Sequence, residues 1–345
     1  MRRVLILHVG PHKTGTSYIQ QRLVADRDLL LARAKVVYPK RGQDVLYGHH
    51  SLATMFRDAA PRLNEIRALR EELCAGDTGL LSSERFSRLD RAQFARLRDH
   101  FPECEIRAVA YLRVRSEVLV SRWGESIKHG MDWSFPEYLA KILVAPYESS
   151  IINQRLLLDV LADVFGLDHL DVLIYRPATD LYAEFVRTVL GAETVISASR
   201  GTNAVVNASL PMHVTECLRL LHAMARARGR QDRDVVTARA MNYLEDPAHH
   251  AALEGVTRVF EERSGAVDVS AVDRTFRHLD EDLMASYADR VKNADADRDF
   301  PASQVTEVRY LRDLAGGGAG ELEETLNRIY REALGESGTP PSGIR

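Results

Sequence analysis

Residues 4–17 read VLILHVGPHKTGTS, a short aliphatic run followed by a polar turn. The run at 4–9 has the length of a buried strand and is too short for an export signal or a membrane span. Gly10 and Gly15 in the turn let the backbone approach a ligand closely, and the amphipathic stretch at 16–34 predicts a helix. A strand, a glycine-containing turn and a helix N-terminus gather backbone N–H groups around one point, which favours an anion site.

Four more short aliphatic runs follow the first, with helical patterns between them. The runs predict strands at 36–38, 79–82, 107–112 and 172–175. Apolar residues at near-helical spacing predict a helix over residues 60–73. Strands that alternate with helices indicate an α/β fold, in which a parallel sheet is flanked by helices.

The pattern changes near residue 210, so we divide the chain into three parts. Residues 1–210 form the predicted α/β core, residues 211–334 are a mainly helical extension of the same domain, and residues 335–345 form a flexible tail rich in Gly, Ser and Pro. Within the core, Ser134 and Glu137 have the spacing of a capping box and predict a helix that starts there.

The composition narrows the classes of partner. The 345 residues have a formal net charge of -3, which provides no general positive field for nucleic acid or an acidic membrane. The three cysteines lie far apart and share no spacing typical of a metal site, which indicates a reducing compartment. We therefore expect a cytoplasmic protein that binds no nucleic acid, spans no membrane and needs no metal.

The turn carries the most informative side chains. Lys13 adds a mobile cation, and Thr14, Thr16 and Ser17 add hydroxyl donors. The loop of nucleotide triphosphatases requires Gly, four residues and then Gly-Lys-Ser/Thr, whereas Thr16 stands where that lysine belongs. The lysine lies earlier in this loop, at a place suited to the bridging oxygen of a phosphosulfate.

Residues 8–17, HVGPHKTGTS, resemble the 5′-phosphosulfate loop of sulfotransferases that use 3′-phosphoadenosine 5′-phosphosulfate (PAPS). Bacterial members often have the pattern His-x-Gly-x-x-Lys-Thr-Gly-Thr-Ser/Thr, which this stretch matches at each position. The resemblance covers about the first two hundred residues. It implies a P-loop-like fold, PAPS as the co-substrate and 3′-phosphoadenosine 5′-phosphate (PAP) as a product, without a required metal. It also implies that seven loop residues hold the donor: Pro11, His12, Lys13, Thr14, Gly15, Thr16 and Ser17.

The resemblance implies a second anchor, for the 3′-phosphate of the donor. In the family, an arginine at a strand end and a serine eight residues later hold this phosphate, and Arg113 and Ser121 have that separation. An arginine offers a planar fork to phosphate oxygens, and a serine two helical turns further on faces the same way. Arg115 is a weaker alternative. Arg200 and Gly201 would form the last cofactor loop, although the lysine that animal members carry there is missing and a plain surface loop is the alternative.

Sulfuryl transfer also needs a base for the acceptor group. Glu84 is the first candidate, because it ends a predicted buried strand and should project from the carboxyl edge of the sheet, where ligands of open α/β sheets bind. It could instead pair with a neighbouring arginine. His49 and His50, in a polar turn, are the alternative bases or else a structural pair. His12 would shape the loop, and His8 would pack in the core.

The sequence thus predicts a sulfotransferase that moves a sulfuryl group from PAPS to a hydroxyl or amine of a carbohydrate, lipid or small-molecule acceptor. Two alternatives stay open. One is a P-loop nucleotide kinase that uses ATP and magnesium, against which the displaced lysine argues. The other is a nucleotide-binding protein that kept the loop and has no catalytic base. The identity of the acceptor and the oligomeric state have no readable signature in the sequence.

Overall fold

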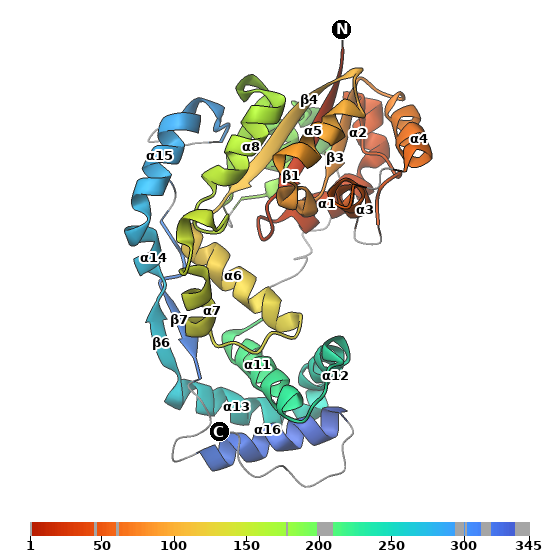
Figure 1. Cartoon of the computed structure of the whole chain (residues 1–345). Helices are drawn as coiled ribbons and strands as arrows, with labels where there is room; N and C mark the ends of the chain where they lie inside the picture. Colours follow the sequence, from red (N-terminus) through yellow and green to blue (C-terminus); the bar gives the residue numbers. More distant parts are fainter. Residues whose placement is uncertain are drawn as a thin grey trace. The chain divides into compact units, whose positions relative to one another are not determined.

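The main sheet consists of five parallel strands in the order β2-β3-β1-β4-β5, with β1 in the middle. Figure 1 shows the computed structural model, which describes residues 2–44, 47–59, 62–176, 179–198, 210–293, 300, 302–311 and 319–334. The strands are β1 (Arg3–Gly10), β2 (Val36–Val37), β3 (Thr78–Ser82), β4 (Cys104–Leu112) and β5 (Leu170–Ile174). All five predicted strands are present, so the α/β fold class with a parallel sheet flanked by helices is confirmed.

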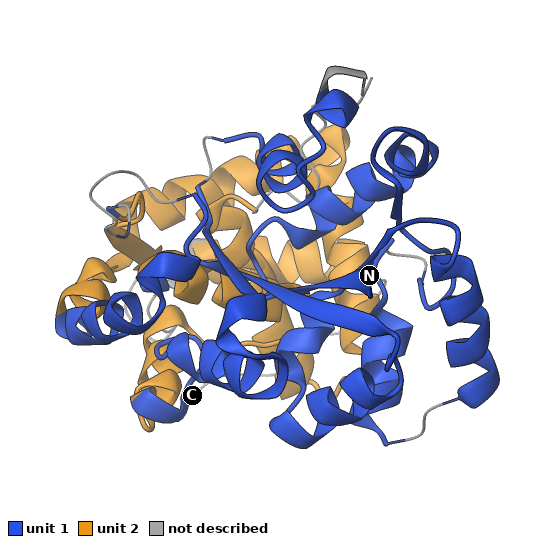
Figure 2. Ribbon diagram, turned by 90° about the horizontal axis from the view of Figure 1, so that it is seen from above, with its two compact units in different colours: residues 1–115, 147–208, 275–302 blue, residues 116–146, 209–274, 303–345 orange. Residues whose placement is uncertain are grey.

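The chain divides into two compact units, coloured separately in Figure 2. Unit 1 comprises residues 1–115, 147–208 and 275–302, and unit 2 comprises residues 116–146, 209–274 and 303–345. Each unit therefore gathers segments from distant parts of the chain. The predicted ranges 1–210 and 211–334 are a simpler division, and they stay a prediction.

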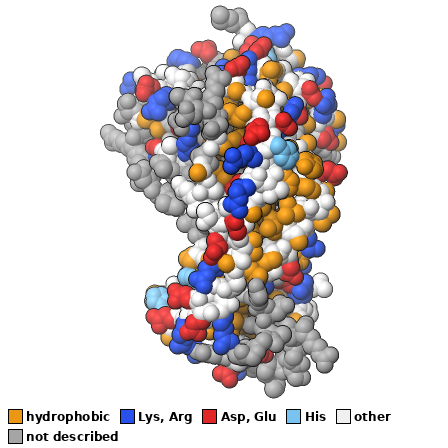
Figure 3. Space-filling model, turned by 90° about the vertical axis from the view of Figure 1, so that its left-hand side faces the viewer, with side chains coloured by type: hydrophobic (Ala, Val, Ile, Leu, Met, Phe, Trp, Pro, Cys, Tyr) orange, Lys and Arg blue, Asp and Glu red, His pale blue; other side chains and the backbone are white. Residues whose placement is uncertain are grey.

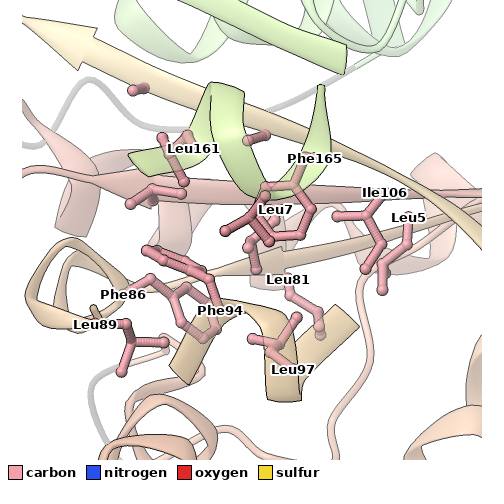
Figure 4. Packing of buried hydrophobic residues seen from close by; sticks show 14 of the residues in the cluster. Leu5, Leu7, Leu81, Phe86, Leu89, Phe94, Leu97, Ile106, Leu161 and Phe165 are labelled. Carbon is pink, nitrogen blue, oxygen red and sulfur yellow. The ribbon is translucent and has the colours of Figure 1, made fainter. Parts of the chain in front are cut away.

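Both faces of the main sheet are covered by buried hydrophobic residues, as the near-continuous aliphatic strands require. Successive residues of β1 alternate between the two layers: Leu5 and Leu7 belong to one cluster and Ile6 to the other. The first layer, shown in Figure 4, contains the rings of Phe94 and Phe165, whose centroids lie 5.8 Å apart in an edge-to-face arrangement.

The helices of unit 1 cover the two faces of the sheet separately. One layer contains residues of α3 (His50–Arg57), α4 (Leu63–Leu73), α5 (Arg91–Asp99), α8 (Arg155–Phe165) and α15 (Arg277–Tyr287). The other contains residues of α1 (Thr16–Ala25), α2 (Arg27–Ala34), α9 (Leu181–Thr188) and α10 (Glu193–Ala198).

The predicted single helix at 16–34 is wrong in one respect, because it is divided at Asp26 into α1 and α2. The Asp26 N–H closes α1 on the Arg22 carbonyl, and its own carbonyl accepts from Leu30 at the start of α2. The predicted helix at 60–73 is confirmed as α4, beginning at Leu63.

Two neighbouring strands send the chain to opposite faces of the sheet. After β1 the chain enters α1 on one face, whereas after β3 it enters the short helix η1 (Glu84–Arg88) and then α5 on the other. Strands β1 and β3 are adjacent and paired from Val4 with Thr78 to His8 with Ser82. In open α/β sheets, ligands bind at the carboxyl ends of the strands where such a switch occurs.

Unit 2 is mainly helical, as predicted for much of its sequence. Its elements are most of α6 (Arg115–Lys128), α7 (Phe135–Ile142), α11 (Met212–Ala227), α12 (Arg233–Glu245), α13 (His250–Arg263), most of α14 (Ser270–Thr275) and α16 (Ala319–Leu334). The predicted start at Ser134 is confirmed: the Glu137 carboxylate accepts from the Ser134 N–H (2.7 Å) and hydroxyl (2.8 Å).

An antiparallel pair of strands in unit 2 was not predicted. β6 (Gly265–Asp268) pairs with β7 (Glu307–Tyr310) over four residues, although about forty residues separate them in the sequence. Within the described residues, no helix combines the length and the hydropathy that a membrane span requires.

Candidate functional site

The turn after β1 has an unusual backbone. Gly10, Lys13 and Gly15 all have positive φ, at 92°, 72° and 75°. This region suits glycine and disfavours a side chain such as lysine, by roughly 1–2 kcal/mol. Lys13 is therefore held in a costly conformation at the centre of the turn, and such outliers concentrate at binding sites.

The turn leads directly into the N-terminus of α1. Gly15 is the N-cap residue and provides no side-chain cap, so the first turn of the helix is not closed by an N-cap side chain. The Thr14 hydroxyl donates to the Pro11 carbonyl (2.7 Å) and lies 3.4 Å from the Thr16 hydroxyl. Because Thr14 is fully buried, its main contribution in the described structure is to close the turn on itself.

Gly10 lies against the backbone of Glu84, which is two residues after the end of β3 and begins η1. A Cβ atom placed on Gly10 would come within 2.9 Å of Glu84 Cα and 3.1 Å of Glu84 Cβ. The absence of a side chain at Gly10 thus allows the phosphate-loop candidate and the base candidate to touch. The two follow β1 and β3, the adjacent strands after which the chain turns to opposite faces of the sheet.

The Glu84 carboxylate is held from two sides and keeps 18% of its side chain exposed. The Gln20 amide, from α1, donates to Glu84 Oε2 at 3.4 Å and to the Ser82 hydroxyl at 3.2 Å. His50 Nε2, from the start of α3, lies 3.6 Å from Glu84 Oε1. Glu84 is therefore partly accessible but fixed in orientation, as a proton acceptor needs to be.

The partners of His50 indicate where its proton lies. His50 Nδ1 is 2.7 Å from the Ser83 hydroxyl oxygen, which also accepts from the Arg85 N–H at 3.1 Å. All three groups are satisfied when Ser83 donates to Nδ1, which leaves Nε2 to donate a proton toward Glu84. His50 is buried, so we assign it to Glu84 rather than to a ligand.

His49 has a different place from its neighbour. Its Nδ1 accepts from the Ser82 N–H at 3.1 Å, so Nε2 carries the proton and donates to the Pro39 carbonyl at 3.2 Å. Burial lowers the pKa of His49 to about 3, which keeps the ring neutral. Both ring nitrogens are used, and the side chain fixes the end of β3.

His8 lies in the core, as predicted. Its Nδ1 is 2.9 Å from the Ser82 hydroxyl, and its ring contacts those of Tyr111 and Phe185. Burial lowers its pKa to about 3. Because Ser82 also accepts from Gln20, a continuous network of hydrogen bonds runs from His8 through Ser82 and Gln20 to Glu84.

Gln20 was missed by the sequence reasoning. It is fully buried and links the first helix to the end of β3 and to Glu84. A signal was present: Gln20 lies one turn after Thr16 and beside Ile19, on a helix face whose other members are buried. A polar residue at a buried helical position needs partners, and here these are site residues.

Arg113, at the end of β4, lies against the loop. Its guanidinium donates to the Lys13 carbonyl and packs over the ring of Tyr175, 4.6 Å from its centroid. Its backbone is fixed by Gln154, which accepts from the Arg113 N–H at 3.0 Å and donates to its carbonyl at 2.7 Å. An arginine fork is therefore held at the edge of the loop.

The other predicted anchors have different outcomes. Arg115, the weaker alternative, is buried and donates to Asp280 (2.5 Å) and to the Ile152 carbonyl (2.5 Å), so its guanidinium serves the fold of unit 1.

Ser121 lies on α6 in unit 2, so its pairing with Arg113 stays a prediction. Arg200 and Gly201 lie outside the described residues. Pro11, His12, Lys13 and Ser17 are all half-buried.

Charged side chains of both signs and possible metal ligands are spread through the described residues without forming a single cluster. On the face shown in Figure 3, Lys and Arg side chains are interspersed with Asp and Glu side chains. Within the described part of the chain, no three His, Cys, Asp or Glu residues come together as a metal site. The absence of a metal requirement and of nucleic acid binding both stay predictions.

The sequence matches no protein-family model and no curated protein. Among solved structures, it is similar to a sulfotransferase from Alicyclobacillus acidocaldarius, with 17% sequence identity and a TM-score of 0.34. The match covers 72% of this chain and 100% of the other. A match of this size says nothing about what the protein does.

Proposed function

We propose that the protein is a sulfotransferase that uses PAPS and releases PAP. The proposed acceptor is a hydroxyl or an amine of a carbohydrate, lipid or small molecule. The observation that carries the proposal is the contact between Gly10 and Glu84, which joins the proposed phosphosulfate loop to the carboxylate that follows β3. A loop and a base in contact are what direct transfer between two bound substrates requires.

In the proposed complex, the loop holds the 5′-phosphosulfate. Backbone N–H groups at the start of α1 and the hydroxyls of Thr16 and Ser17 would bind its oxygens. Lys13 would meet the oxygen that bridges phosphorus and sulfur. Negative charge grows on this oxygen as the bond to sulfur breaks, so the lysine stabilises the transition state more than the ground state.

Glu84 is the proposed base. The acceptor oxygen or nitrogen forms a bond to sulfur while the bond between sulfur and the bridging oxygen breaks. The acceptor proton passes to the Glu84 carboxylate, and PAP leaves with the electron pair of the broken bond. Gln20 and His50 orient the carboxylate without contacting substrate, so we describe both as positioning residues.

Arg113 is the proposed contact of the 3′-phosphate, together with Ser121. The guanidinium lies on the Lys13 carbonyl and on Tyr175, which would bring the two phosphate sites close together. An arginine fork can bind two phosphate oxygens at once. Arg200 and Gly201 remain proposed additional contacts.

Calorimetry with three nucleotides tests the proposal. We expect PAP to bind more tightly than AMP by a factor of roughly 10–100, because hydrogen bonds between charged groups contribute about 1.5–3 kcal/mol. Binding should not require magnesium. Arg113→Ala should reduce the difference between PAP and AMP, whereas Arg33→Ala, an exposed arginine on α2, should leave it unchanged.

Two results would redirect the proposal. Equal affinity for PAP and AMP would remove the 3′-phosphate site, and magnesium-dependent binding of ATP would favour the nucleotide kinase. Tight PAP binding without turnover on any acceptor, in a screen with labelled PAPS, would favour the non-catalytic nucleotide-binding protein.

A further inference from the structure

Unit 2 contains a cavity of about 480 Å³, formed by the end of α6, the end of α11 and the start of α12. Its size is within the range of small-molecule sites, roughly 300–1,000 Å³. All of its lining residues belong to unit 2. The cavity is therefore separate from the loop, Glu84 and Arg113, which belong to unit 1.

Two helix ends of the same kind shape the cavity. Gly130 after α6 and Gly229 after α11 both have positive φ, at 85° and 76°. In each turn the glycine N–H donates three residues back and the next N–H donates five residues back, which closes the helix on its own carbonyls. The carbonyls at both ends therefore already have donors, which reduces the negative charge that helix C-termini present to the cavity.

Gly130 also fixes the side chain of Arg233. A Cβ atom on Gly130 would come within 2.6 Å of Arg233 Cβ and 2.8 Å of Arg233 Cδ. The stem of Arg233 thus packs directly on the glycine backbone, although Arg233 is exposed to solvent. This contact fixes the stem of Arg233, a residue that lines the cavity and is open to solvent.

The charges around the cavity do not cancel. Arg226 pairs with Asp132 at 2.8 Å, and Arg230 pairs with Asp232 at 2.6 Å. Arg233 has no acidic partner within the part of the chain that the structure describes. It is also the first residue of α12, where the positive end of a helix disfavours a cation. Arg233 therefore differs from Arg226 and Arg230 in that no carboxylate among the described residues competes with an anion for its charge.

The remaining lining is neutral. His222 is buried, its Nε2 lies 3.1 Å from the Thr237 hydroxyl, and burial lowers its pKa. Ala225 and Val236 provide apolar contact. A ligand would thus find one unpaired cation, two arginines already paired with acids, and a partly apolar wall.

We propose that this cavity binds a small organic molecule that carries one oxyanion group, a carboxylate, sulfate or phosphate monoester. Arg233 binds the oxyanion through its guanidinium fork, and Ala225 and Val236 contact the body of the molecule. The inference concerns binding alone and does not rest on the proposed sulfotransferase reaction. A plain alternative is that the arginines serve only as surface cations near helix ends.

Calorimetry with 1-naphthalenesulfonate, which joins one oxyanion to an apolar body, tests the site. The titrations use the full chain with Lys13→Ala, which weakens anion binding at the loop in unit 1, and any binding that remains at the loop is unaffected by a change at Arg233. We expect binding at a ratio of one to one, reduced about tenfold or more by Arg233→Ala, as loss of a charge-assisted hydrogen bond predicts. Arg239→Ala, on the same helix and outside the cavity, is the matched control and should change nothing.

Two further titrations show whether the cavity recognises the oxyanion group or only the apolar body of the probe. Sodium sulfate should compete weakly, which would identify the oxyanion as the recognised group, and neutral 1-naphthol should not bind. Equal affinity in Arg233→Ala and Arg239→Ala would overturn the proposal, as would equal binding of 1-naphthol. If Arg233→Ala fails to fold, Arg233→Gln, which keeps a long polar stem, replaces it and should show the same loss.

Discussion

Replacing Gly10 by alanine tests how closely the loop and Glu84 depend on each other. The added Cβ would lie 2.9 Å from Glu84 Cα, against about 3.4 Å for ordinary contact, so the two backbones must separate by about 0.5 Å. The positive φ of Gly10 adds strain of roughly 1–2 kcal/mol. Overpacking adds about 1–3 kcal/mol.

The separation should affect catalysis more than folding. A misplacement of about 1 Å can cost roughly 100-fold in rate, so a shift of half that size should cost about tenfold. The free energy of unfolding is measured by urea denaturation, PAP affinity by calorimetry and turnover with labelled PAPS and an acceptor from the screen. We expect Gly10→Ala to lose about 2–5 kcal/mol of stability and at least tenfold in turnover.

Gly166→Ala is the matched control. Gly166 has nearly the same φ, 95°, but its added Cβ would meet only His169 Cδ2, at the ordinary distance of 3.4 Å. This variant should lose stability through strain and keep its turnover and PAP affinity. If Gly10→Ala behaves like Gly166→Ala in all three measurements, the contact with Glu84 has no role in the site, and the proposed geometry is refuted.

Four further predictions concern single side chains. Lys13→Ala should lower turnover by about 10²–10³ and should lower PAP affinity by a smaller factor. Lys35→Ala changes a lysine that also has positive φ but lies outside the loop, and it should match the parent. Near-normal turnover of Lys13→Ala at saturating PAPS would show that Lys13 only shapes the loop. Glu84→Gln should lower turnover by about 10²–10⁴ with unchanged PAP affinity, and an active variant would transfer the role of base to a histidine. Gln20→Leu should lower turnover about tenfold without affecting PAP affinity, and a parallel loss of both would indicate a structural role. The pKa of His49 is about 3 in the folded protein and about 6.5 when unfolded, so its contribution to stability is present above pH 6.5 and is lost as the pH falls toward 3. Between pH 7 and pH 5, the free energy of unfolding, measured by urea denaturation, should therefore fall by about 2 kcal/mol more in the parent than in His49→Gln. Equal losses in the two proteins would contradict the assignment.

The sheet was predictable because its strands are buried on both faces. Val4 to Val9 are nearly all aliphatic, and such runs are hard to accommodate elsewhere in a chain of this composition. The break at Asp26 was not predictable, since neither glycine nor proline marks it and the change of direction follows from packing. The pairing of β6 with β7 depends on contacts between distant segments, for which four-residue strands carry no local signal.

Part of the candidate site was predictable from the sequence, and part of it was not. Lys13 and Glu84 were found because each follows a strand, so the topology alone brings them to one edge of the sheet. The roles of His49 and His50 could not be separated, because adjacent residues in a turn differ only in which way their rings point. The role of Gln20 depends on tertiary contacts too, since its partners are Ser82 at the end of β3 and Glu84 at the start of η1.

The pairing of β1 with β3 has a consequence for how the protein loses activity. The loop follows the end of β1, and Glu84 is two residues after the end of β3. Backbone hydrogen bonds between the two strands, rather than contacts within the loop, therefore fix the distance between the loop and Glu84. Local fluctuations that open loops at little cost leave such a ladder closed, because it separates only when the sheet itself opens. Heating should therefore inactivate the protein at the temperature where the sheet melts, and amide exchange at the strand ends should be as slow as in the core.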